Sequence, residues 1–252
     1  MNRLFAILII LIAAACNNET TLNDLQKEKW NGKIKSITTS TFFYDSTKAE
    51  PHLGKLINKT IRLFNESGNE TSCTLVNEED EVESIKKYGY NKNNLKSELK
   101  ETDEEGNLLS TANFSYNKNQ LISEIISVDN NTNETNRLVN NYDKNNNISF
   151  SISYNGKNEM EYKIENSYDD SKQLIEERIF LGNGQLDYKS TYLYDEKGRV
   201  TINRGYASDR SKLWEIKNEY TSFDKEGNWI AKHIFKDGKL INVVQVQIEY
   251  FQ

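Results

Sequence analysis

The chain has 252 residues, a formal net charge of −6 and a mean hydropathy of −0.77, and 28% of its residues are charged. An acidic chain without a basic cluster is a poor match for nucleic-acid binding, which relies on Lys and Arg to neutralise phosphates. Its 14 Tyr and 10 Phe, together with the periodicity described below, argue against intrinsic disorder.

The amino terminus has the layout of an export signal. Arg3 precedes an apolar run over residues 4–12, which is too short to span a bilayer, and Ala13-Ala14-Ala15 then leads to Cys16. This arrangement resembles the lipobox of bacterial lipoproteins, with Ala13 in place of the more usual Leu. The resemblance implies a signal peptide over residues 1–15 and lipid attachment at Cys16. Because the residues after Cys16 lack an inner-membrane retention Asp, we expect an outer membrane lipoprotein, either periplasmic or surface-exposed.

A polar tether over residues 16–29 follows, in which only residues 22–29 could form a short helix. The remaining residues, 30–252, make up a single repeat domain. Its irregular stretch, residues 46–56, contains the only proline, Pro51, and predicts a longer loop.

The repeat is a turn that recurs every 26 residues. An aromatic residue followed by Asp or Asn starts it, and Gly or Asn often stands four residues after the aromatic, where a left-handed backbone is needed. Sustained self-similarity at a fixed period indicates a repeat architecture. A second, weaker turn lies 12 residues after each of these. The main turns start at Phe64, Tyr90, Tyr116, Tyr142, Tyr168 and Tyr194.

Turns at this spacing leave room for one strand of about 7 to 9 residues between each pair. The sequence therefore predicts an all-β protein, a repeat-built antiparallel β-meander of about 15 strands. Alternation along the strands suggests an apolar, aromatic face and a polar face. Because no helices are available to cover the apolar face, we expect the sheet to curl over it as a partial shell or a wide barrel. Charged residues on this face, such as Glu124 and Arg204, argue against a membrane-spanning barrel.

The copy Tyr194-Asp195-x-x-Gly198-Arg199-Val200 resembles the YD repeat of the Rhs family. That resemblance covers about residues 30–252, although only the copies at Tyr194 and Phe223 match it well. It implies a strip of β-sheet that spirals into a shell. The chain has no toxin-sized tail or extra core domain, so the resemblance carries architecture and not toxin delivery.

Catalytic and metal signatures are weak. The two histidines, His52 and His233, lack ligands at zinc spacing, and each Asp-rich turn offers too few carboxylates for calcium. With Cys16 lipidated, Cys73 would have no disulfide partner. We therefore expect no enzyme activity, no metal and no cofactor.

Two non-enzymatic functions remain. The first is a binding module whose aromatic face takes a carbohydrate or an amphipathic ligand. The plainer alternative, which we prefer, is that these tyrosines are the core, with Arg and Glu paired across strands. The second function is a scaffold lipoprotein that docks an envelope protein partner. The candidate ligand-binding residues are Tyr154, Tyr162, Tyr188, Tyr192, Tyr206, Arg178, Arg204, Glu124 and Glu176.

Overall fold

The structure is a computed structural model that describes residues 22–45 and 52–252. In these ranges the chain forms one short helix, α1 (Asp24–Lys27), and 16 strands. The strands are β1 (Ile34–Asp45), β2 (His52–Phe64), β3 (Glu70–Val76), β4 (Val82–Tyr90), β5 (Lys96–Thr102), β6 (Leu108–Tyr116), β7 (Ile122–Asp129), β8 (Thr135–Tyr142), β9 (Ile148–Tyr154), β10 (Met160–Tyr168), β11 (Leu174–Leu181), β12 (Leu186–Tyr194), β13 (Val200–Ala207), β14 (Lys212–Phe223), β15 (Trp229–Lys236) and β16 (Lys239–Tyr250).

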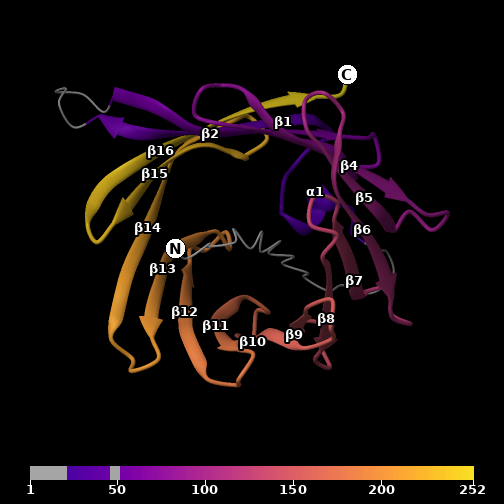
Figure 1. Cartoon of the computed structure of the whole chain (residues 1–252). Helices are drawn as coiled ribbons and strands as arrows, with labels where there is room; N and C mark the ends of the chain where they lie inside the picture. Colours follow the sequence, from indigo (N-terminus) through magenta and orange to yellow (C-terminus); the bar gives the residue numbers. More distant parts are fainter. Residues whose placement is uncertain (1–21, 46–51) are drawn as a thin grey trace.

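Each strand pairs antiparallel with the next, and β1 also pairs with β16, so the meander closes into a barrel. Figure 1 shows the strands as a ring that surrounds α1. The predicted all-β meander is confirmed, with one strand more than the expected 15 or so and with closure. The strip does not spiral, because its first and last strands bond to each other. The predicted loop at residues 46–56 is too long at its end, since β2 already begins at His52.

The turns have the predicted chemistry. At the copy that starts at Tyr194, the Asp195 amide donates to the Arg199 carbonyl (3.0 Å), and the Gly198 amide donates to the Asp195 carbonyl (2.9 Å). The Asp195 carboxylate accepts the amides of Lys197 and Arg199 (3.0 and 2.9 Å). Gly198 adopts φ 73°, in the left-handed region where a side chain is disfavoured. In all six main turns an Asx residue opens the turn, and the closing left-handed residue is glycine or asparagine in four of them and Gln120 and Lys172 in the other two.

A bulge accompanies these turns. In β12 and β13, Leu193 is paired with Ile202, but Tyr194 is paired with Val200, so the register shifts by one residue between these pairs. The same shift occurs at Tyr90 and at Tyr168. An extra residue beside a turn changes which face the following side chains occupy, because the strand period is two.

The inward face can be traced from α1. The Arg62 side chain bonds to Glu28 just after α1, inside the ring, so Arg62 points inward. Residues directly opposite on neighbouring strands share a face. Arg62 is opposite Cys73, Cys73 opposite Lys86, and Lys86 opposite Glu101. The same pairing, followed around the ring, gives a second inward row on β10 to β14. Its residues are Asn166, Glu177, Ser190, Gly205 and Trp214.

The buried inward residues of β8 to β12 are polar. Ser151, Ser153 and Ser190 lie on the inward face and are buried, whereas Leu63, Ile126 and Leu193 on the outward face are 43%, 37% and 49% exposed. The expectation that the sheet curls over an apolar face is therefore wrong for these strands. Sixteen strands enclose more space than side chains can fill. Accordingly, inward residues such as Tyr162 and Tyr188 are only partly buried.

Candidate functional site

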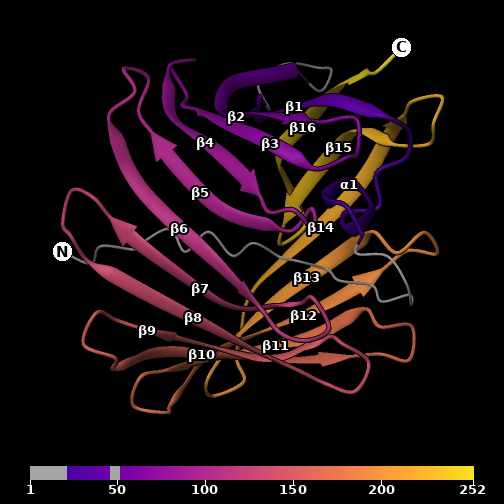
Figure 2. The ribbon, with the colours of Figure 1, turned by 90° about the vertical axis from the view of Figure 1, so that its right-hand side faces the viewer.

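The segment 22–33 lies across one end of the barrel, where the aromatic–Asx turns are. At one side, the Leu25 amide donates to the Gly68 carbonyl in the β2–β3 turn (3.2 Å). At the other, Asn31 exchanges hydrogen bonds with Asn228 in the β14–β15 turn (2.8 and 2.9 Å). Figure 2 shows α1 near this end. An Asn23 capping box begins the helix, since Asn23 and Gln26 each accept the other's amide.

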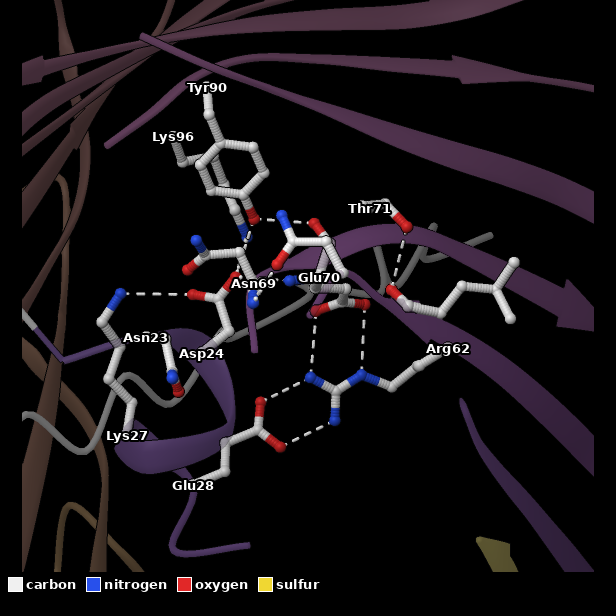
Figure 3. Close-up of polar contacts among 12 residues, drawn as sticks. Asn23, Asp24, Lys27, Glu28, Arg62, Asn69, Glu70, Thr71, Tyr90 and Lys96 are labelled. Carbon is white, nitrogen blue, oxygen red and sulfur yellow. Dashed lines mark hydrogen bonds and ion pairs between the residues drawn. The ribbon is translucent and has the colours of Figure 1, made fainter. Parts of the chain in front are cut away.

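A charged network fixes this segment to the barrel wall (Figure 3). The Arg62 guanidinium donates to both oxygens of Glu28 (2.7 and 2.6 Å) and to both oxygens of Glu70 (3.1 and 2.9 Å). Burial alone would lower the pKa of Arg62, but the bonds to Glu28 and Glu70 outweigh it and raise that pKa. A bidentate guanidinium between two carboxylates holds both in a fixed geometry.

Asp24 is the second node of the network. Its carboxylate accepts the Glu70 amide (3.0 Å) and the Tyr90 hydroxyl (2.8 Å) and lies 3.6 Å from Lys96 Nζ. Burial would raise the pKa of Asp24, but Lys96, Lys27 and these hydrogen bonds outweigh it and lower the pKa. The charged side chains of this network are paired with one another, so its role is to attach the segment to the barrel wall.

Apolar packing completes the attachment. Leu25 packs in a buried cluster with Ile34, Ile37, Phe64 and Val246, at 0–5% exposure. The rings of Trp30 and Trp229 lie 5.6 Å apart beside it. A pocket of about 280 Å³ remains between the segment and the β2–β3 turn. This end of the barrel holds the apolar core of the molecule.

A row of tyrosine hydroxyls runs around the inside of the same end. Each tyrosine lies at or near the end of an even-numbered strand and donates to the carbonyl of the residue 20 positions earlier, which is the first residue of the preceding strand. The bonds are Tyr90–Glu70 (2.7 Å), Tyr116–Lys96 (2.7 Å), Tyr142–Ile122 (2.7 Å), Tyr168–Ile148 (3.0 Å), Tyr194–Leu174 (2.8 Å) and Tyr220–Val200 (3.2 Å).

Some of these carbonyls receive a second donor. Asn140, Asn166 and Asn218 each stand two residues before a tyrosine and donate to the same carbonyl (3.0, 3.1 and 3.1 Å). This Asn-x-Tyr pattern recurs in the sequence but was not used to predict the faces. Because the Asn and Tyr side chains share one acceptor, the pattern indicates that both lie on the same face.

The inward face of β10 to β13 carries unpaired polar groups. Glu177 is 5% exposed, and no hydrogen bond or ion pair to it occurs among the described residues. Burial raises the pKa of Glu177. The side-chain oxygens of Asn166 and Asn203 are also buried without a partner. Asn166 is directly opposite Glu177, and Asn203 is directly opposite Tyr192. Buried polar groups are normally bonded, so two such oxygens beside an unpaired carboxyl on one face need an explanation.

The structure divides the predicted ligand-binding residues between the two faces. Tyr162, Tyr188 and Tyr192 point inward. The others point outward: Tyr154, Tyr206, Arg178, Arg204, Glu124 and Glu176. The prediction that all nine share one concave face is therefore wrong, because the bulges beside the turns were not counted.

The outward residues form ion pairs with each other and with neighbours. Arg137 Nη1 lies 3.1 Å from Glu124, and its guanidinium stacks on Tyr154. Lys189 Nζ lies 3.1 Å from Glu176 and stacks on Tyr206. Two further pairs, Arg204–Glu215 (2.6 Å) and Arg178–Glu165 (3.2 Å), continue this pattern. The outer wall thus carries charges at mid-strand, paired across strands as the plainer alternative predicts.

The remaining sequence predictions concern the amino terminus, the cysteines and a metal site. The signal peptide and Cys16 lie outside the described residues. Cys73 is a free thiol on the inward face. In the described part of the chain, no three His, Cys, Asp or Glu side chains gather as a metal site would need. The described residues also contain no helical segment with the length and apolarity of a bilayer span.

Comparison with known proteins supports the fold. No protein-family profile and no curated sequence matches this chain. The crystal structure of a porin-like protein from Bacteroides uniformis is similar, with 13% identity, a TM-score of 0.60 and coverage of 87% of this chain and 99% of that one. A TcdB2–TccC3 structure matches 72% of this chain and 12% of its own at 14% identity, with a TM-score of 0.23. The first likeness shows the barrel fold, and the second is too weak to support an argument.

Proposed function

We propose that this protein is a lipid-anchored barrel of the cell envelope that stands in water and binds a small ligand in its interior. The observation that carries this is the inward face of β10 to β13, where the side-chain oxygens of Asn166 and Asn203 are buried without a partner. On the same face, Glu177 is buried as a residue and has no hydrogen bond or ion pair among the described residues. Tyr188 and Tyr192 flank them with ring surface. A wide barrel with a few convergent polar groups among aromatic rings is a typical binding site. The proposal includes no catalytic step.

The outer wall supports a barrel in water. A membrane barrel needs an apolar band about 25 Å tall on its outside. Here Glu124, Arg178 and Arg204 occupy outward positions in the middle of their strands. A charge on the lipid face at the bilayer midplane costs about 2 to 4 kcal/mol for Arg or Lys. Several such residues are compatible with water and not with lipid.

The amino terminus supports the anchor. Cys16 stands in a lipobox-like context, and five residues separate it from Leu22, where the described chain begins. The segment 22–33 then crosses the end with the aromatic–Asx turns. With a lipid on Cys16, that end would face the membrane and the other end would face away from it. The likeness to a porin-like protein is compatible with a location at the outer membrane.

The anchor and the solubility can be tested together. The full-length protein and Cys16→Ser are expressed in a diderm bacterium and labelled with an alkyne-bearing palmitate. We expect label only on the wild type. The soluble part, residues 17–252 preceded by a cleavable export signal, is expected to be monodisperse without detergent. A requirement for detergent, with conductance in planar bilayers, would show a membrane-spanning barrel instead.

The occupant can be tested by native mass spectrometry of the wild-type lipoprotein, gently extracted from its own membrane. A small added mass that is lost on denaturation supports interior binding. A protein-sized partner supports the alternative function, a scaffold that docks an envelope protein. A bare barrel from several growth conditions would contradict both.

A further inference from the structure

We infer that the interior site around Glu177 binds a small organic cation, one that carries an ammonium or guanidinium group. This inference rests on the proposed interior binding and specifies its ligand. The site is built from four neighbouring strands, β10 to β13, and Asn203 on β13 lies opposite Tyr192. Asn166 on β10 and Ser190 on β12 flank Glu177 on either side, and Tyr192 follows Ser190 on the same inward face.

The buried side-chain atoms without a partner in this site are hydrogen-bond acceptors. The amide nitrogen of Asn166 donates to the Ile148 carbonyl, which leaves its oxygen free. The Asn203 oxygen is buried and free as well. The Glu177 carboxyl adds two oxygens. Acceptors without donors select a ligand that brings N–H groups, and a carboxylate among them favours a ligand with positive charge.

Among the described residues, no cation pairs with Glu177. The inward residues of β10 beside Glu177 are Ile164, Asn166 and Tyr168, and those of β12 are Tyr188, Ser190 and Tyr192. None of these side chains is charged at neutral pH. By contrast, the inward carboxylate Glu101 has Lys86 at 3.6 Å, and Glu70 has Arg62 at 2.9 Å. Unlike Glu70 and Glu101, Glu177 has no cationic partner among the described residues, so a positively charged ligand could supply it.

The aromatic rings suit the same ligand class. An organic cation over a tyrosine face gains about 0.5 to 2 kcal/mol, more when water is excluded. Inside this barrel, Lys96 Nζ lies 3.8 Å from the centroid of the Tyr88 ring, which is a cation–π contact of the same kind. Tyr188 and Tyr192 stand on both sides of Ser190 and offer the same surfaces near Glu177.

The charge at the far end of the barrel favours cation entry. The described residues place a crossing segment at one end only, and the turns at the other end include 77–81 and 103–107. Lys55 and Lys59 pair with part of the first turn, Glu78, Glu79 and Asp80. Glu81, Glu104 and Glu105 have no ion pair among the described residues. Acidic groups at an opening raise the local concentration of cations.

Binding should depend on the protonation of Glu177. Burial raises the pKa of Glu177, and a bound cation would lower it again. Binding of a cation therefore weakens as the pH falls through that pKa, whereas binding of a neutral sugar would not depend on a negative charge at Glu177.

The experiment uses the soluble protein, residues 17–252, with spermidine as the cationic probe and maltotriose as the neutral probe. Isothermal titration at pH 7 and low salt compares the wild type with Glu177→Gln. The matched control is Glu176→Gln, the adjacent residue that points outward. We expect spermidine to bind the wild type and the control equally and Glu177→Gln at least tenfold more weakly. Repeating the titration at lower pH should weaken spermidine binding to the wild type, because the Glu177 carboxylate is protonated there.

The outcomes separate this inference from the proposed function. Maltotriose binding to the wild type, with no spermidine binding, would overturn the cation and leave interior binding in place. Equal spermidine binding to Glu177→Gln would assign the binding to the acidic turns and overturn the site. No binding of either probe, with no small mass on the extracted lipoprotein, would overturn both.

Discussion

The hydroxyl of Tyr194 donates to the main-chain carbonyl of Leu174 at 2.8 Å, from the end of β12 to the start of β11. The two residues are 20 positions apart, and the next bond of this kind around the ring has the same spacing at a distance of 3.0 Å, from Tyr168 to Ile148. Because the acceptor is always the first residue of the preceding strand, the bond fixes the hairpin in one register. A slip by one residue would break it and turn every side chain to the other face.

Removal of one hydroxyl should show whether this bond stabilises the barrel. Tyr194→Phe leaves the Leu174 carbonyl without its side-chain donor and should lower the free energy of unfolding by about 1 kcal/mol. Tyr168→Phe should cost less, because Asn166 still donates to the Ile148 carbonyl at 3.1 Å. Urea unfolding followed by tyrosine and tryptophan fluorescence measures both. If Tyr168→Phe costs more than Tyr194→Phe, the second donor does not compensate.

The network at α1 predicts a loss of stability in acid. The pKa of Asp24 is lowered in the folded protein, so its contribution is complete above its unfolded value of 3.8 and is lost as the pH falls through the folded pKa. Asp24→Asn should lower the stability at pH 7 by about 2 kcal/mol, because charged hydrogen bonds are lost. Its stability should then fall less steeply below pH 4 than that of the wild type.

The control for that comparison is Asp187→Asn, an exposed residue on β12. Urea unfolding of the three proteins between pH 2.5 and pH 7 gives the slopes. Parallel slopes for the wild type and Asp24→Asn would show that another group carries the acid dependence.

Glu177 should have the opposite pH dependence. The pKa of Glu177 is raised in the folded protein. Its contribution to the free energy of unfolding is therefore highest below the unfolded pKa of 4.5, and it falls as the pH rises through the folded pKa, because a buried charge must then form. Glu177→Gln should therefore be more stable than the wild type at pH 7, by about 1.4 kcal/mol for each unit of the rise. At pH 4 the two proteins should be nearly equal. Thermal unfolding at both pH values measures this, and a variant less stable at pH 7 would contradict an unpaired, buried carboxyl.

Cys73 should be unreactive in the folded barrel. Burial, aided by Glu70, raises the pKa of its thiol to about 11, so little thiolate exists at pH 8. Iodoacetamide labelling at pH 8 should be slow without urea and fast in urea. A suitable positive control is Leu193→Cys in a Cys73→Ser background, since Leu193 is 49% exposed on the outer wall. Equal labelling rates for the two thiols would place Cys73 at the surface.

The repeat was enough to predict the strands and turns. Side-chain chemistry within a few residues decides a turn, as at Asp195 and Gly198, so a single sequence contains all of it. The period then fixes the strand length, and short turns force antiparallel neighbours. Closure into a ring was only one of the predicted possibilities. It depends on β1 meeting β16, a contact between residues more than 200 positions apart.

The candidate site was harder to predict because face assignment depends on the bulges. Tyr188 and Tyr206 are both aromatic and both half-buried, yet one points inward and the other outward. Without the bulge beside each turn, the period-two pattern would have placed them together. Glu177 was not singled out either, since its neighbour Glu176 is identical in type and only the register distinguishes them.

Two contacts at opposite sides of segment 22–33 limit how this protein can evolve. Asp24 reaches Lys96 at the start of β5, and Asn31 reaches Asn228 between β14 and β15. Duplication of one 26-residue repeat would add two strands and change no hairpin contact, but it would widen the ring. The two points that the segment joins would then lie farther apart, while the segment keeps its length. We therefore expect the crossing segment to favour one circumference, and repeat number to be conserved in relatives that keep it, even where the repeats themselves diverge.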